Sequence, residues 1–304
     1  MNEPFEPKNE EPPLEVPNEP VAPPYNPYYA TAPYFQPKPR KPYPSFGAAI
    51  GLLGILLGFS IAGGFVLGVV LNSFPAFSSF GFMLIYLISF VLTLWLGLIF
   101  RRSNEFSKKW GPWYLWPMLF ILTLLFLFVR EPLLHMIPIP VDPQEDVLSG
   151  LEILDPFLVF VTVVAAPVFE ELIFRGIILD GFLKRYSPWK SILLSALIFG
   201  VAHLNPLQFI NAFMLGLLMG WIYWKTRSLL LTMLIHFVNN AAATFPAYYL
   251  SGEGSMVKQW TGGGVNFAMY YLIGVILFFG VLFLTWYLVN LHSRKTTQDL
   301  FIAQ

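Results

Sequence analysis

The stretch PFLVFVTVVAAPVFEELIFRGIIL, residues 156–179, is apolar except for three charged residues in its second half: Glu170, Glu171 and Arg175. An α-helix needs about 20 residues to cross the hydrocarbon core of a bilayer, so this stretch is long enough. Charged side chains inside a bilayer are costly, and those that occur there usually have a function. The stretch therefore predicts a membrane-spanning helix with a functional site around Glu170.

The composition extends this prediction to the whole chain. Of its 304 residues, 56% are hydrophobic and only 12% are charged, which is typical of a multi-pass membrane protein. We therefore expect an all-α polytopic membrane protein with about eight transmembrane helices. The apolar segments that predict them are residues 46–71, 80–100, 113–129, 157–179, 191–204, 207–224, 229–250 and 267–291.

The first 45 residues differ in composition from the rest. They hold 14 of the 26 prolines and show no apolar periodicity, which predicts a disordered, proline-rich tail. Behind it we expect three transmembrane helices in residues 46–129, a core in residues 151–250 and a last transmembrane helix in residues 267–291. The chain has no cysteine, so a disulfide frame or a thiolate site is excluded. A net charge of zero argues against a nucleic-acid partner.

The basic residues predict the orientation in the membrane. Fourteen of the 18 Lys and Arg residues fall before, between or after the helices on one side, whereas only Arg130 and Lys258 fall in the opposite loops. Because basic loops face the cytoplasm, both termini are expected there, with an outer loop over residues 130–150. This pattern suits a multi-pass protein of a bacterial plasma membrane.

The ionisable residues inside the predicted helices lie at similar depths. Counted from the nearest cytoplasmic charge at about 1.5 Å per residue, Glu170 lies ~15 Å deep, His203 ~20 Å and His236 ~14 Å. Asn240 follows one helical turn beyond His236. Three helices thus bring polar side chains to one layer, and we expect a single site there.

The spacing within each helix suggests separate roles. Glu171 and Arg175 lie four residues apart on one face and are expected to pair. Glu170 is turned by about 100° from Glu171 and has no such partner on its own helix. An apolar pocket suits a free carboxylate to act as a general base near neutral pH.

The polar side chains of the later helices complete the expected site. His236 and Asn240 also lie four residues apart, so both can donate hydrogen bonds to a developing oxyanion. His203 can orient an attacking water together with Glu170. One Glu and two His are also the ligand types of a catalytic zinc site, which leaves two interpretations open. Either Glu170, His203 and His236 hold a divalent metal, or Glu170 activates water without one.

Three motifs in this order resemble a known family. They are Glu-Glu-x-x-x-Arg (Glu170, Glu171, Arg175), Phe-x-x-x-His (Phe199, His203) and His-x-x-x-Asn (His236, Asn240). The resemblance is to the CPBP family of CAAX-prenyl-protease-like and bacteriocin-processing intramembrane endopeptidases, also called the ABI family. It covers about residues 151–249 and implies a CAAX-protease-like membrane core.

The resemblance also implies a role for each motif residue. Glu170 is the catalytic glutamate, and Glu171 with Arg175 supports it. His203 is a partner for the water, and His236 with Asn240 is the oxyanion or ligand pair. The family is often described as a metalloprotease, which fits the interpretation with zinc.

The expected function is therefore that of an intramembrane endopeptidase. It would hydrolyse a peptide bond of a membrane-associated protein or peptide by glutamate-activated water, with the lipid bilayer as its surroundings. The alternatives are a non-catalytic peptide-binding or immunity membrane protein and a proton-coupled transporter, in which Glu and His relays also occur. The lack of an internal repeat argues against the transporter. Nothing in the sequence identifies the substrate or indicates that a prenyl group is recognised.

Overall fold

The computed structural model describes residues 41–71, 78–136, 155–249 and 265–302. Within these ranges the chain is almost entirely helical and contains no β-strand, apart from one isolated bridge between Lys108 and Ser228. The expected all-α fold is confirmed. Most of the proline-rich tail, up to residue 40, lies outside the described residues.

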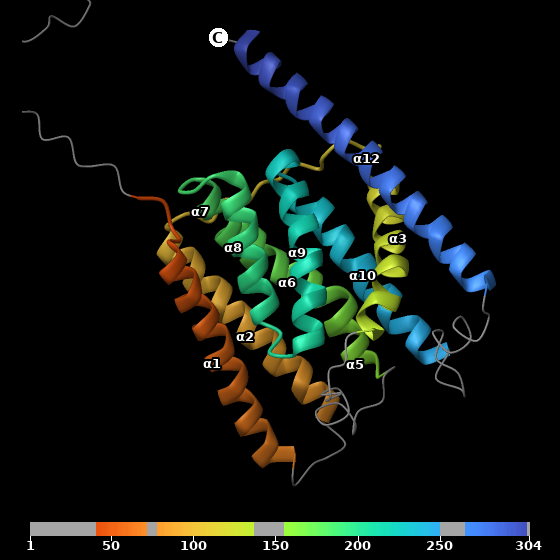
Figure 1. The fold of residues 1–304 in the computed structure, drawn as a ribbon. Helices are drawn as coiled ribbons and strands as arrows, with labels where there is room; N and C mark the ends of the chain where they lie inside the picture. Colours follow the sequence, from red (N-terminus) through yellow and green to blue (C-terminus); the bar gives the residue numbers. More distant parts are fainter. Residues whose placement is uncertain (1–40, 72–77, 137–154, 250–264, 303–304) are drawn as a thin grey trace, which may run out of the picture. The chain divides into compact units, whose positions relative to one another are not determined.

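The described residues form eight helical stretches in succession, which can be followed in Figure 1. The fourth changes type along its length and is called the central helix here; its segments are α5 (Pro156–Val159), the π-helix η2 (Phe160–Ala165), α6 (Ala166–Glu171), the π-helix η3 (Leu172–Leu179) and α7 (Asp180–Leu183). The others are α1 (Phe46–Leu71), α2 (Ser78–Arg101), α3 (Leu115–His135), α8 (Pro188–Val201), α9 (Pro206–Thr226), α10 (Leu229–Tyr249) and α12 (Val265–Ile302).

Six of these stretches are long and apolar enough to cross a membrane, and the chain is a multi-pass membrane protein. Two apolar stretches among the described residues are shorter, α8 (Pro188–Val201) and the Leu229–Thr244 part of α10. The segment expected at residues 207–224 extends at both ends to the 21 residues of α9. The prediction of about eight apolar helices therefore holds, although only six meet the length of a full span.

The third helix is longer than the sequence indicated. The apolar run ends at Val129, so we expected Arg130 to open an outer loop, but α3 continues through Pro132 to His135. The reason lies in the packing: the Arg130 side chain is buried and bonds to Asn211 of α9 and Asn239 of α10. These polar partners, on helices distant in sequence, make a buried guanidinium tolerable within a span.

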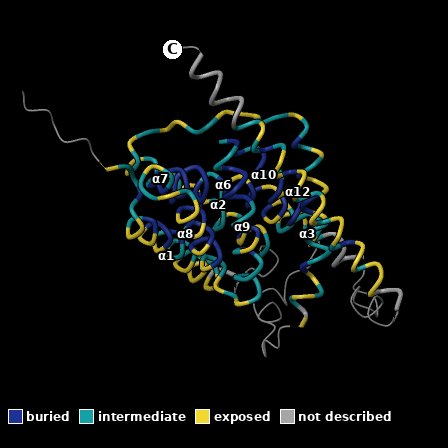
Figure 2. Tube along the Cα trace, turned by 45° about the horizontal axis from the view of Figure 1, so that its top comes forward, coloured by how far each residue is buried: buried dark blue, intermediate teal, exposed yellow. Residues whose placement is uncertain are grey.

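The central helix is enclosed by its neighbours. It contacts α2, α8, α9 and α10. Half of its span is buried, against 17% for the spans of α1 and α12, whose large apolar side chains remain exposed for lipid. Figure 2 shows the same contrast, with buried residues around α6 and α7 and exposed residues along α1 and α12.

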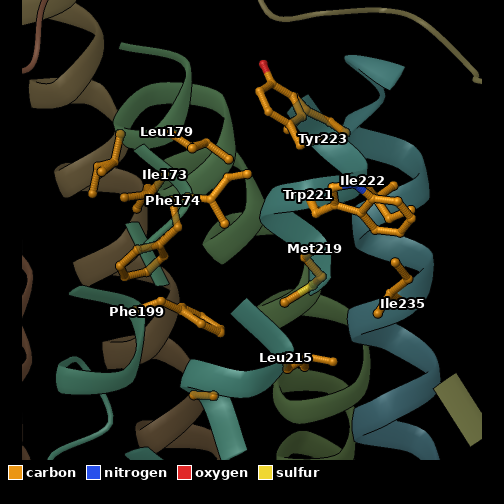
Figure 3. Packing of buried hydrophobic residues seen from close by; sticks show 14 of the residues in the cluster. Ile173, Phe174, Leu179, Phe199, Leu215, Met219, Trp221, Ile222, Tyr223 and Ile235 are labelled. Carbon is orange, nitrogen blue, oxygen red and sulfur yellow. The ribbon is translucent and has the colours of Figure 1, made fainter. Parts of the chain in front are cut away.

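Close packing of α8 on α9 fixes one wall of the core. A side chain on Gly216 of α9 would come within 3.1 Å of the Ala196 Cβ atom of α8, so the small residue allows the two helices to approach closely. Phe199 of α8 also lies beside Gly216, and it packs against Phe174 of the central helix in an edge-to-face contact, with ring centroids 5.0 Å apart (Figure 3).

An ionic cluster holds the far end of the central helix. Asp180 pairs with Lys184 at 2.6 Å, with Arg227 at 2.9 Å and with Arg101 at 3.3 Å. Because Arg101 ends α2 and Arg227 follows α9, this one carboxylate ties the central helix to two neighbours.

Candidate active site

The two adjacent glutamates lie between two π-helical segments. Before them, the Ala166 N–H bonds to the carbonyl of Val161, five residues back, so the helix widens just ahead of Pro167, which has no N–H to donate. After them, η3 runs from Leu172 to Leu179. Such widened turns occur frequently at functional sites. Nothing in the apolar pattern of the sequence had indicated them.

Glu171 is held through one of its two carboxylate oxygens, while its Oε2 atom is buried without a hydrogen-bond partner among the described residues. Its Oε1 atom lies 2.7 Å from Arg175 Nη1, so the predicted pair is present. The side chains of Glu171 and Arg175 are 0% and 1% exposed. The same oxygen lies 3.0 Å from His236 Nδ1. Because a carboxylate only accepts, Nδ1 carries the proton of this hydrogen bond. Glu171 therefore anchors Arg175 and orients the imidazole of His236.

Phe199 connects the three motifs. Its ring lies 4.4 Å from the Arg175 guanidinium carbon, which is a cation–π contact. The rings of His203 and His236 meet the same ring edge-on, with centroids 5.1 and 5.7 Å away. One aromatic side chain of α8 thus touches the cation of the central helix and both histidines.

Glu170 has one oxygen held and one oxygen free. Its side chain is only 12% exposed. Oε1 accepts a hydrogen bond of 2.8 Å from the Tyr86 hydroxyl of α2. Oε2 is buried and accepts no hydrogen bond from the described residues, and His236 Nε2 lies 3.8 Å from it. A buried carboxylate oxygen without a donor is available to take a proton from a bound molecule.

His203 is linked to the other predicted residues through Phe199. It follows the end of α8, where its Nδ1 donates to the Phe199 carbonyl at 2.9 Å. In the neutral ring this leaves Nε2 as an acceptor. The structure therefore joins Glu170, Glu171, Arg175 and His236 by direct contacts, while His203 borders them across an aromatic ring.

Asn240 is reached through a chain of amides. Its Nδ2 donates to the Thr162 carbonyl of η2 at 2.8 Å, and its Oδ1 accepts from Asn239 Nδ2 at 3.0 Å. Asn239 Oδ1 in turn accepts a hydrogen bond of 3.3 Å from Arg130 Nη1. The amide that the sequence favoured as an oxyanion donor is thus connected to a buried cation on another helix.

Comparison with known proteins assigns this arrangement to a family. Residues 152–242 match the model of the type II CAAX prenyl endopeptidase Rce1-like family, and they include all six predicted site residues. These residues are similar to that family and are called the CAAX-protease core here. An uncharacterized 24.3 kDa protein of Escherichia coli is 28% identical over 174 residues, which cover 53% of this chain and 75% of that protein. No solved structure matches the chain.

Two contacts of the CAAX-protease core come from outside the matched residues. Tyr86 of α2 holds Glu170, and Arg130 of α3 reaches Asn239. The sequence analysis missed both contacts. A signal was available for Tyr86, because a hydroxyl near the middle of an apolar helix requires a hydrogen-bond partner.

A metal site finds no support in the geometry of this CAAX-protease core. Among the described residues, no three His, Asp or Glu side chains gather in a way that could hold a metal ion. His236 and His203 donate Nδ1 to Glu171 and to the Phe199 carbonyl, which leaves each Nε2 free, but these two nitrogens do not gather with Glu170 into one set of ligands. Since the donor set does not fit, we derive no step through a metal.

Proposed function

We propose that the chain is an intramembrane endopeptidase in which Glu170 activates water against a peptide bond of a membrane-associated substrate. The observation that carries this proposal is the contrast between two neighbouring carboxylates. Each keeps one buried oxygen without a donor, but the other oxygen of Glu171 is bonded to Arg175 and His236, whereas that of Glu170 accepts only from the neutral Tyr86 hydroxyl. The family match supports a CAAX-protease-type endopeptidase, and Glu170 is the residue best placed for the proton transfers.

The proposed reaction uses Glu170 twice. Oε2 takes a proton from water as the water oxygen attacks the peptide carbonyl carbon, which forms a tetrahedral oxyanion. Glu170 then returns the proton to the amide nitrogen, the C–N bond breaks, and a carboxylic acid and an amine leave. Tyr86 keeps Oε1 in place during both transfers, so that Oε2 faces the substrate.

Two side chains of α10 are proposed to stabilise the oxyanion. The side-chain N–H of Asn240 would move its hydrogen bond from the Thr162 carbonyl to the oxyanion. Because His236 donates from Nδ1 to Glu171, its Nε2 can donate only when the ring is doubly protonated. The positive charge of His236 then balances the charge of Glu170, since Arg175 already balances that of Glu171.

The bilayer determines which substrates can reach the site. The site is formed by apolar helices of a multi-pass protein, so a peptide tethered to the membrane is the substrate class that we propose. The basic loops support a plasma-membrane orientation with both termini in the cytoplasm.

The proposal is tested on purified protein with a library of lipid-anchored, internally quenched peptides. Glu170→Gln keeps an acceptor for Tyr86 but cannot take a proton, so cleavage should fall by at least ~10²-fold. The fold should survive, because a neutral amide is less costly to bury than a carboxylate. Glu105→Gln, the same change at an exposed position after α2, is the matched control and should cleave at the wild-type rate.

Each outcome separates the proposal from its alternatives. Cleavage by Glu170→Gln at the wild-type rate would show that the carboxylate is not the base. A wild-type protein that binds the peptides without cutting them would favour the non-catalytic peptide-binding alternative. Once cleavage is established, comparing membrane-protein C-termini in cells that carry wild-type or Glu170→Gln protein identifies the substrates.

A further inference from the structure

Arg130 is a buried charge that the reaction described above does not use. Its side chain is 4% exposed, and its Nε hydrogen-bonds to none of the described residues. Its Nη2 atom bonds to Glu131 at 3.2 Å, and its Nη1 atom bonds to both Asn211 and Asn239. An arginine inside a membrane span is costly, so its contacts call for an explanation.

The chemistry of the guanidinium sets the direction of every hydrogen bond beyond it. A guanidinium only donates, so the amide of Asn239 must turn its oxygen toward Arg130. The NH2 group of Asn239 then points the other way, where it donates to Asn240 Oδ1 at 3.0 Å. With its oxygen engaged there, Asn240 presents its own NH2 on the far side, toward the Thr162 carbonyl.

We propose that Arg130 is a positioning residue that acts through Asn239 and keeps the Asn240 amide in the donor orientation. The inference rests on the proposed function, since it assigns Asn240 an oxyanion to stabilise. An amide has nearly the same shape in its two orientations. In the flipped one its oxygen would face the oxyanion and repel it. Arg130 excludes that orientation from two residues away.

The first test removes the hydrogen bond from Asn239 to Asn240 without changing the size of the side chain. Asn239→Asp still accepts from Arg130 but has no NH2 for Asn240 Oδ1, so the Asn240 amide loses the contact that orients it. Loss of one oxyanion donor lowers kcat by about 10²–10³-fold, and we expect a decrease of that size with KM changed less than threefold. Asn211→Asp is the matched control, because it places the same carboxylate beside Arg130 outside the chain to Asn240. It should stay within threefold of the wild-type kcat.

The second test asks whether the effect passes through Asn240. Asn240→Ala should lower kcat about as much as Asn239→Asp, and the double variant should be no slower than Asn240→Ala alone. Arg130→Lys, which also only donates, should retain more activity than the similarly long Arg130→Met. Thermal unfolding of each variant shows whether it is folded, and only folded variants enter the comparison. If neither Arg130 variant folds, the Asn239 and Asn211 variants decide the question.

The inference is overturned if Asn239→Asp cleaves as fast as Asn211→Asp. It is also overturned if the decreases in kcat caused by Asn239→Asp and Asn240→Ala multiply in the double variant. A role limited to packing predicts such independence, because it would lower stability without depending on Asn240. Wild-type activity in Asn240→Ala would likewise remove the donor that Arg130 is proposed to position. Failure of the proposed function is seen separately in Glu170→Gln, which leaves Arg130 and both asparagines unchanged.

Discussion

Removing Glu171 should destabilise this protein more than removing Glu171 and Arg175 together. The pair is completely enclosed, with a 2.7 Å contact and side chains that are 0% and 1% exposed. When one member of a buried pair is removed, the other stays behind as an uncompensated charge, which costs about 3–5 kcal/mol. When both are replaced by apolar residues, no charge is stranded. The change to make is therefore Glu171→Leu, Arg175→Leu and the double variant.

The two single losses should differ, because the stranded residue has different partners in each case. In Arg175→Leu, Glu171 still accepts from His236 Nδ1 at 3.0 Å. In Glu171→Leu, Arg175 keeps the face of Phe199 at 4.4 Å and the charge of Glu170, but no hydrogen-bond partner among the described residues, since its Nε and Nη2 atoms already have none. We expect Glu171→Leu near ~5 kcal/mol and Arg175→Leu near ~3 kcal/mol. If the double variant loses less than Glu171→Leu, the coupling energy exceeds the Arg175→Leu loss, so it is at least ~3 kcal/mol.

Equilibrium unfolding in mixed detergent micelles, followed by helical circular dichroism, measures all three free energies of unfolding. The wild type and all three variants must unfold reversibly for the cycle to be valid. Additive losses would show that the two residues do not stabilise each other. A larger loss for Arg175→Leu than for Glu171→Leu would refute the argument from His236, while leaving the pairing itself intact.

Two further predictions concern Glu170 and the metal. Tyr86→Phe removes the donor that holds Oε1 and should lower kcat by about 10–10²-fold, since a hydrogen bond to a charged group contributes about 1.5–3 kcal/mol. Tyr287→Phe, on the lipid-exposed side of α12, should have no effect, and equal rates for the two variants would exclude a role for Tyr86. Dialysis against a strong chelator should leave peptide cleavage within twofold of its starting rate, because the described residues gather no set of three ligands. A loss of activity that added zinc restores would instead establish the zinc interpretation.

Contacts within one helix could be predicted from the sequence. Glu171 and Arg175 lie four residues apart, and helical geometry alone brings their side chains together. Depth in the membrane was also predictable. Counting residues from the basic loops placed His236 at nearly the same depth as Glu170, and in the structure His236 contacts the neighbouring Glu171. The class of fold followed from composition and the length of the apolar segments.

Contacts between helices could not be predicted in the same way. Depth does not tell which helix faces which, so the approach of Tyr86 to Glu170 and of Arg130 to Asn239 had no counterpart in the sequence pattern. Arg130 was also placed in a loop, because the apolar run stops before it and Pro132 follows. Only packing against polar side chains of α9 and α10 continues that helix, and those side chains are more than 80 residues away.

The two glutamates show how such packing divides roles between neighbours of identical chemistry. Helical geometry turns them apart, but it does not decide which one becomes the base. Arg175 and His236 engage Glu171 and hold it as a fixed anion, whereas α2 offers Glu170 a single hydroxyl. A carboxylate that neutralises a buried guanidinium loses that role when it takes a proton, so Glu171 is poorly suited to proton transfer. Glu170 has no such obligation, and its protonation leaves the pair of Glu171 and Arg175 balanced. The partners of Glu171 are therefore the reason that we propose Glu170 as the carboxylate that exchanges protons with a substrate.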